Sequence, residues 1–246
     1  MKRCILVIDV GGTNVKLLAT GRRKRAKFES GPDMTPAAMV KAVKAIVADW
    51  NYDVVTIGYP GPVENDRPAA EPHNLGPGWC RYDFARAFGS PVQMINDAAM
   101  QALGAYAGGK MLFLGLGTGL GSAMIVDGVV VPLELAHLPY RHGRTYEDYV
   151  GAAALERLGK QRWRHHVGVV VDLLRVALQA GEVVLGGGNA RLVRDLPRGV
   201  RCGRNADAFR GGYRLWQLHD RPRPWVRFSS RAPRAGEASP LRRKRR

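Results

Sequence analysis

The chain has 246 residues, 46% of them hydrophobic, and a formal net charge of +17. This size allows a substantial core, and no apolar run reaches the ~18 residues that a membrane-spanning helix needs. The N-terminus shows no signal-peptide cleavage pattern, so we expect a cytoplasmic protein with no membrane partner. The three cysteines, Cys4, Cys80 and Cys202, are far apart and form no CxxC pair, so we expect neither a disulfide framework nor a structural zinc site.

The positive charge is concentrated at the C-terminal end. Residues 221–246 contain ten Lys or Arg and one Glu, together with several Pro and Ser. Such a segment buries little apolar surface, so we expect a flexible basic tail. Two interpretations stay open: a clamp for a polyanion, and a solvated tail without a function of its own.

The first half of the chain opens with a predicted β-hairpin. Arg3–Val10 and Val15–Thr20 have the composition of strands, and Gly11-Gly12 between them is typical of a tight turn. Further elements expected in this half are a strand at Arg22–Phe28, a helix beginning at Thr35-Pro36, a strand at Asp53–Tyr59, a short helix at Tyr82–Phe88, a strand at Val92–Ile95 and a helix at Ala98–Tyr106.

The second half repeats this layout of strands, glycine turn and helices. The expected elements are strands at Met111–Leu116, Ser122–Val126, Val129–Pro132 and Val183–Leu185, and helices at Tyr146–Leu158, Trp163–Gln179 and Asn189–Leu196. We therefore predict two α/β lobes with a cleft between them, residues 1–106 and 107–220, followed by the tail 221–246.

The first motif with chemical potential is Asp9–Lys16, with the sequence DVGGTNVK. Adjacent glycines leave backbone N–H groups free to face a phosphate, a threonine adds a hydroxyl and a lysine adds charge. The residues assigned to the phosphate donor are Gly11, Gly12, Thr13, Asn14 and Lys16. Asp9, at the strand end, suits a hydrated Mg²⁺. The alternative is an ordinary Gly-Gly hairpin with an edge aspartate.

A second glycine turn, LGTGLG at Leu116–Gly121, follows the same logic, with Gly117, Thr118 and Gly119 as candidate donor ligands. A dinucleotide-binding site would need a helix after this turn, whereas Ser122–Val126 is predicted to be a strand. Two such hairpins in one chain favour a phosphate donor held from both lobes. A later glycine run contributes Gly187 and Gly188, whose N–H groups suit an anion, although a tight connection is the simpler interpretation.

Two polar motifs suit a sugar. Asn96-Asp97 follows an apolar strand, where the Asp97 carboxylate can accept a proton from an attacking hydroxyl; the same residue is also a good helix N-cap. Glu134 and His137 are three residues apart and suit vicinal hydroxyls, although a surface pair without function explains them as well.

These motifs, in this order, resemble the ROK family of bacterial sugar kinases and repressors. The resemblance runs from about Ile5 to Trp216, and its segments are DVGGTNVK, GYPGPV, NDAA, LGTGLG, ELAH and LGGGN. It implies an actin-like (ribonuclease-H-like) two-lobed fold, Mg²⁺ dependence and a homodimer. It also implies that Asp97 is the base and that the hexose is bound by Asn74, Asn96, Asp97, Glu134, His137 and Glu147.

The chain departs from the family pattern at two places. Ala136 stands where the family usually has glycine, and Pro139–Tyr149 replaces the cysteine-rich zinc motif. In lacking the zinc motif, and in segments such as EDYVG and AFRGGYRLW, the chain resembles the polyphosphate glucokinase branch. This resemblance implies glucose as acceptor and inorganic polyphosphate as donor, and it leaves ATP open as a second donor. Specific nucleic-acid binding is not expected. An ATP-dependent hexose kinase and a non-catalytic sugar sensor or polyanion-binding protein remain the alternatives, and mannose and glucosamine remain alternative acceptors.

Overall fold

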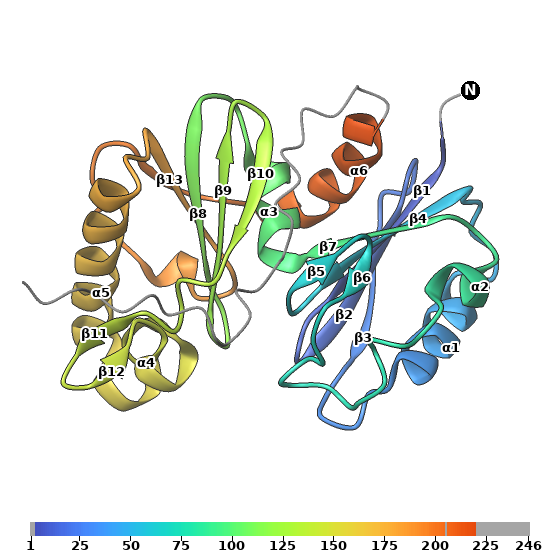
Figure 1. Cartoon of the computed structure of the whole chain (residues 1–246), viewed down its shortest axis with the longest axis horizontal. Helices are drawn as coiled ribbons and strands as arrows, with labels where there is room; N and C mark the ends of the chain where they lie inside the picture. The colour runs from blue at the N-terminus through green and yellow to red at the C-terminus, as the bar shows by residue number, and fades with distance from the viewer. Residues whose placement is uncertain (1–2, 205, 220–246) are drawn as a thin grey trace, which may run out of the picture.

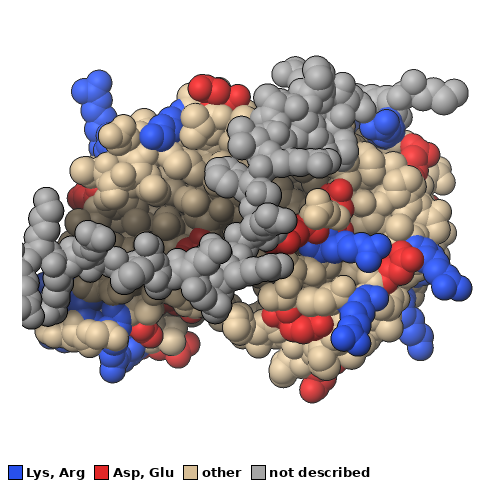
Figure 2. Space-filling model, in the orientation of Figure 1, with Lys and Arg blue, Asp and Glu red and all other residues tan. Residues whose placement is uncertain are grey.

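The computed structural model describes residues 3–204 and 206–219, so the predicted tail at 221–246 lies outside the described residues. Two five-stranded sheets stand side by side, and the helices α3 (Asp97–Ala105) and α6 (Asp207–His219) lie between them (Figure 1). Lys and Arg side chains are spread over both lobes on the face shown in Figure 2.

The first sheet has the strand order β3-β2-β1-β4-β7. Its strands are β1 (Ile5–Val10), β2 (Asn14–Ala19), β3 (Ala26–Glu29), β4 (Val54–Tyr59) and β7 (Val92–Asn96). The pairs among β1, β2 and β3 are antiparallel, whereas β4 and β7 join in parallel. The remaining elements of this half are α1 (Pro36–Ile46), α2 (Phe84–Phe88) and the small hairpin of β5 (Val63–Glu64) and β6 (Arg67–Pro68).

The second sheet repeats this topology with the order β10-β9-β8-β13-β14. Its strands are β8 (Lys110–Leu116), β9 (Leu120–Val126), β10 (Val129–Leu133), β13 (Glu182–Gly186) and β14 (Val200–Cys202). A two-stranded hairpin, one 3₁₀ turn and two helices complete it: β11 (Pro139–Arg141), β12 (Arg144–Thr145), η1 (Ala190–Leu192), α4 (Glu147–Val150) and α5 (Ala152–Ala177). In both halves the central strand carries an antiparallel hairpin on one side and parallel strands on the other.

Strand β1 is buried over its whole length because helices cover both faces of the first sheet. Leu6 and Ile8 belong to the core that includes α1, while Ile5 and Val7 pack with residues of α6. A strand covered on both faces has a continuous apolar sequence. Helix α1 begins as predicted, with the Thr35 hydroxyl accepting the Ala38 N–H.

Helix α6 was not predicted, because its glycines, Gly211 and Gly212, weaken a helical pattern. The structure gives them a reason: a Cβ at Gly211 would overlap the Met100 carbonyl of α3, and one at Gly212 would lie 2.5 Å from Val7 of β1. Helix α6 thus packs against the first sheet, where Thr56 donates to the Gly212 carbonyl at 2.9 Å. The division at residue 106/107 stays a prediction; α3 ends and β8 begins on either side of it.

Several predicted elements have different bounds. The helix expected at Asn189–Leu196 is only the 3₁₀ turn η1, and the strand expected at Arg22–Phe28 is the shorter β3. The break expected between the two helices around Gly159 is present: α5 consists of two helical stretches that meet at a kink, where this residue has a non-helical φ of 74° and ψ of 162°. Only glycine adopts this conformation at little cost.

Candidate active site

The carboxyl ends of three parallel strands bring the predicted catalytic residues to one edge of the first sheet. The strand register places Asp9 of β1 beside Gly58 of β4, and Gly58 beside Ile95 of β7. Asn96 ends β7 and Asp97 begins α3. Asp9 and Asp97 therefore lie at the same edge, two strands apart.

Asp97 is surrounded by groups from both lobes. The pKa of its carboxyl is raised to about 7, chiefly by burial and then by the charges of Asp9 and, to a smaller extent, Glu134, while the Ala98 N–H and Lys16 act to lower it. The Ala98 N–H donates to Asp97 Oδ1 at 2.7 Å. Although it lies deep between the lobes, the residue is only partly buried and keeps some exposed surface. A carboxyl group with a pKa near neutrality is suited to exchange a proton at physiological pH.

The N-cap of α3 is Asn96, whereas the sequence had suggested Asp97 as the cap. The Asn96 side-chain oxygen accepts the Ala99 N–H at 3.0 Å, and its Nδ2 donates to the Gly61 carbonyl at 3.1 Å. Asn96 therefore ties the helix start to the GYPGPV turn. Asp97, the next residue, does not cap the helix. A sugar-binding role for Asn96 stays a prediction.

The first glycine turn is closed by its own backbone and by β3. The Gly11 N–H donates to the Asn14 carbonyl at 3.1 Å, and the Ser30 N–H donates to the Thr13 carbonyl at 3.0 Å. Thr13 is exposed at the tip. A Cβ at Gly12 would lie 3.1 Å from the Asn74 Cβ, so this turn and the predicted sugar-side loop are in contact.

The second glycine turn is held by Glu147. The Leu120 N–H donates to Glu147 Oε2 at 2.9 Å, and a Cβ at Gly119 would overlap this carboxylate. The Ala152 N–H, at the start of α5, donates to the Thr118 carbonyl at 3.0 Å. Glu147 therefore supports the turn, and its assignment as a sugar ligand stays a prediction.

The late glycine run is packed on the same turn. Gly187 has a φ of 79°, and a Cβ there would overlap the backbone of Leu116. The Asn189 N–H donates to the Leu116 carbonyl at 3.0 Å, and its Nδ2 donates to the Gly117 carbonyl at 3.4 Å. One loop cluster thus contains the residues of both glycine segments: Gly117, Thr118, Gly119, Gly187 and Gly188. The donor-binding roles of its members stay predictions.

The two lobes meet where α3 begins. A Cβ at Gly121, just after the second turn, would lie 2.9 Å from the Ala98 Cβ, and one at Gly58 would lie 3.7 Å from the Asp97 Cα. Both glycines permit a close approach to the residues around the catalytic candidate. This requirement was not evident from the sequence, because glycine in a strand indicates close packing without naming the partner.

Glu134 and His137 follow β10 in an irregular segment, so they do not share one helical turn. Both side chains are exposed. The Leu138 N–H donates to the Leu135 carbonyl at 3.2 Å, which closes a turn that contains His137. Glu134 is close enough to Asp97 to raise its pKa, whereas the role of His137 stays a prediction.

Comparison with known proteins identifies the family. The family model described as "ROK family" matches residues 5–132, which is just over half of the chain. The chain belongs to the ROK family. A polyphosphate glucokinase of Mycobacterium tuberculosis is 28% identical over 208 residues, covering 75% of this chain and 77% of the relative.

Solved structures of sugar kinases have the same fold. An inorganic polyphosphate/ATP-glucomannokinase from Arthrobacter sp. strain KM matches with a TM-score of 0.77 and 25% identity over 88% of this chain and 99% of that one. A ROK family glucokinase from Streptomyces griseus, in complex with glucose and AMPPNP, matches with a TM-score of 0.70 and 17% identity over 86% of this chain and 98% of that one. The predicted actin-like two-lobed fold is confirmed. The protein is a sugar kinase of this family, a phosphotransferase with a hydroxyl acceptor.

The surroundings of Asp9 fit a Mg²⁺ ion held mainly by water and phosphate. Asp9 is buried and receives the Lys16 Nζ at 3.1 Å on Oδ2, while its Oδ1 accepts no hydrogen bond from the described part of the chain. Within residues 3–204 and 206–219, no cluster of three or more His, Cys, Asp or Glu is arranged to hold a metal. A single carboxylate beside a phosphate-binding turn is the usual protein share of a Mg²⁺ site.

None of the helices in residues 3–204 and 206–219 is both long and apolar enough to cross a membrane.

Proposed function

We propose that this ROK kinase is a polyphosphate glucokinase, which transfers a phosphoryl group from inorganic polyphosphate to the 6-hydroxyl of glucose. The observation that carries the proposal is Asp97, a carboxyl group of raised pKa that neighbours Asp9 of the first lobe and Glu134 of the second. Similarity to the Mycobacterium tuberculosis polyphosphate glucokinase and to the Arthrobacter inorganic polyphosphate/ATP-glucomannokinase supports polyphosphate as donor. We place the enzyme in the cytoplasm and expect it to act as a homodimer.

In this proposal Asp97 accepts the proton of the 6-hydroxyl as that oxygen attacks the terminal phosphorus. The new O–P bond forms while the bond to the bridging oxygen of the donor breaks, and the shortened chain leaves with the electron pair. Asn74, Asn96, Glu134, His137 and Glu147 are proposed to surround the sugar.

The two glycine turns fix the donor in this proposal. N–H groups and hydroxyls of the first turn, at Gly12, Thr13 and Asn14, and of the second, at Thr118 and Gly119, face the phosphates, with Gly187 and Gly188 beside the second turn. Gly11 and Gly117 shape these turns, because the Gly11 N–H donates to the Asn14 carbonyl and the Gly117 N–H to the Gly119 carbonyl. Lys16 adds a positive charge on the side of Asp9. Mg²⁺, when bound near Asp9, offsets charge on the phosphates.

The donor assignment is tested by measuring glucose 6-phosphate formation by the purified protein with polyphosphate and with ATP. We expect kcat/KM to be higher with polyphosphate, because a long polyanion can contact several basic groups at once. Higher kcat/KM with ATP would instead make the protein an ATP-dependent hexose kinase. Glucose binding without transfer from any donor would make it a sugar sensor. Mannose and glucosamine, assayed in parallel, test the acceptor.

The raised pKa of Asp97 predicts a pH dependence of the reaction. A general base must be ionised, so kcat/KM for glucose should rise with pH and level off above a midpoint near pH 7, the pKa of Asp97 before glucose binds. Initial rates at fixed saturating donor and Mg²⁺ give this profile. A profile that is flat from about pH 5.5 to about 8.5, well across this midpoint, would contradict the assignment of Asp97 as the base.

A further inference from the structure

A row of basic side chains lies on one face of the β2–β3 ribbon. Lys16 of β2 is directly opposite Lys27 of β3, and Asp9 of β1 is directly opposite Lys16. Because side chains alternate along a strand, Leu18 lies on the same face as Lys16, and Arg25 on the same face as Lys27. The face carrying Lys16 and Lys27 thus continues from the candidate active site toward the β2–β3 turn.

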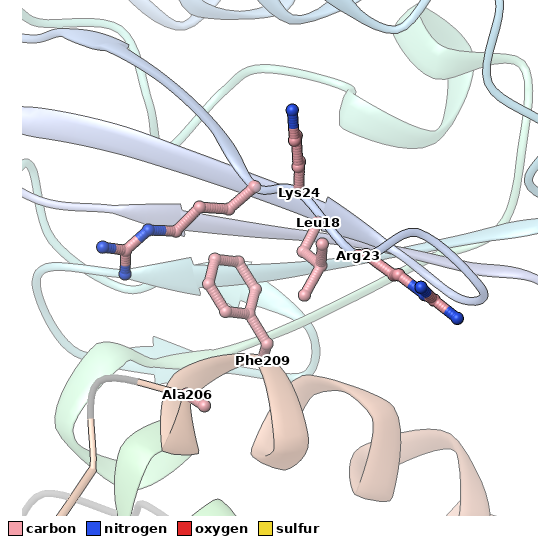
Figure 3. Close-up of a pocket in the computed structure, with 6 residues that line it drawn as sticks. Leu18, Arg23, Lys24, Ala206 and Phe209 are labelled. Atoms are coloured by element: carbon pink, nitrogen blue, oxygen red, sulfur yellow. The ribbon is translucent and has the colours of Figure 1, made fainter.

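The far end of this row opens into a groove. It has a volume of about 500 Å³ and is lined by Leu18, Arg23, Lys24, Arg25, Ala206 and Phe209. Figure 3 shows Phe209 of α6 rising from below toward Leu18 on the strand above, which forms an apolar floor. Arg23 extends sideways from the β2–β3 turn, and Lys24 points upward from it, away from Phe209. The groove therefore combines an apolar floor with a basic rim.

Apart from Lys16, which pairs with Asp9, the basic groups of this row lack acidic partners among the described residues. Within residues 3–204 and 206–219, Arg23, Lys24, Arg25 and Lys27 form no ion pair, whereas the adjacent Arg22 lies 3.9 Å from Asp49 and stacks over Trp50. Lysines placed directly opposite on neighbouring strands repel each other. An anion lying across Lys16 and Lys27 would remove this repulsion, so the arrangement favours a negatively charged ligand with several charges in line.

We propose that the row Lys16, Lys27, Arg25 and Arg23 binds the distal part of a linear polyphosphate whose terminal phosphate lies at the first glycine turn. The inference rests on the proposed function and extends it to the path of the donor chain. Lys16 connects the row to the reaction, because its charge acts on Asp97 and it contacts Asp9. The groove beside Phe209 is where the chain leaves the protein.

The direction of the path is set by Glu29. This exposed carboxylate is opposite Asn14 on the same face, one step beyond Lys27 toward the tip of the first turn. A polyanion following the row would be repelled there, so it turns from Lys16 toward the Gly11-Gly12 turn and does not continue along β3. Glu29→Gln is therefore expected to lower the KM for long polyphosphate.

The triple variant Arg23→Gln/Arg25→Gln/Lys27→Gln tests the row in the full chain. Its matched control is Lys41→Gln/Lys44→Gln/Arg86→Gln, which removes the same charge from exposed residues of α1 and α2 in the same lobe. Helix α1 packs on the opposite face of the first sheet from Lys16. Both variants are compared with the parent for KM with long-chain polyphosphate and with tripolyphosphate, and for direct binding of labelled long-chain polyphosphate without glucose.

We expect the row variant to raise the KM for the long chain roughly ten-fold and to reduce the slope of log affinity against log salt by about 2, since three phosphate contacts are lost. The KM for tripolyphosphate should change little, because a short chain does not reach the groove. The control variant should resemble the parent in all of these measurements.

The outcomes separate this inference from the proposed function. If the parent uses polyphosphate and the row variant keeps its chain-length preference and affinity, the row is refuted while the proposed function stands. If the parent transfers phosphate only from ATP, the proposed donor is wrong. In that case, the proposed row is supported only if the parent binds long polyphosphate and the row variant loses this affinity. Equal affinity of parent and row variant for long polyphosphate would overturn it. Tighter binding of single-stranded DNA than of polyphosphate of equal charge would also overturn it.

Discussion

Asp97→Asn is expected to lower kcat by a factor between about 100 and about 10,000, the range typical for loss of a general base. The amide cannot take the proton of the sugar hydroxyl. Its oxygen can still accept the Ala98 N–H, which donates to Asp97 Oδ1 at 2.7 Å in the structure, so the start of α3 should be preserved. Glucose affinity, measured by calorimetry, should remain close to that of the parent.

The matched control for this variant is Asp83→Asn. Asp83 caps α2 by accepting the Arg86 N–H at 3.0 Å, and it is exposed. Asparagine caps a helix as well as aspartate does, so neither kcat nor thermal stability should change. Near-normal kcat in Asp97→Asn would remove Asp97 from the mechanism.

Thermal unfolding gives Asp97→Asn a second readout. Burial, the largest cause, raises the pKa of Asp97 from 3.8 to about 7, so the ionised form is disfavoured in the folded state. As pH rises from about 4 to about 7, the unfolded chain releases this proton before the folded chain does, and the parent loses stability. The variant lacks this loss, so its Tm relative to the parent should increase over this interval. An unchanged difference in Tm would indicate a pKa close to that of a solvated aspartate.

Gly211→Ala is expected to destabilise the protein by about 2–3 kcal/mol, which corresponds to a decrease in Tm of roughly 5–10 °C for a protein of this size. An added Cβ would overlap the Met100 carbonyl and lie 3.0 Å from the Gly104 backbone nitrogen, and backbone atoms within a helix cannot move aside independently. The helices α3 and α6 would therefore have to separate. Because α3 carries Asp97, kcat should decrease as well.

The matched control is Gly168→Ala on α5. A Cβ at Gly168 meets no atom within 4 Å, and the residue lies inside a helix. Replacing glycine by alanine in a helix interior stabilises it, typically by about 0.5–1 kcal/mol. Thermal denaturation of both variants measures the contrast. Equal Tm values for Gly211→Ala and the parent would show that the crossing of α3 and α6 is not tightly packed.

The predicted elements with strong local signals are present in the structure. The hairpins around Gly11-Gly12 and Leu116–Gly121 and the helix start at Thr35-Pro36 all form. Each depends on residues adjacent in the chain: glycines that permit a tight turn, apolar runs that fill a buried strand, and a hydroxyl that caps a helix. Helix α6 lacked such a signal, because its glycines are explained only by contacts with α3 and β1.

The sequence by itself determined the family, the two glycine turns and the polar residues around Asp97. These are properties of short segments, because the residue types in each segment determine its chemistry. Tertiary structure alone decided that Asn96, not Asp97, caps α3, that Glu147 holds the second turn, and that Lys16 faces Lys27. These facts depend on strand register and on the approach of residues distant in the chain. The pKa of Asp97 belongs to the same class, because burial between the lobes and the charges of Asp9 and Glu134 exist only after folding.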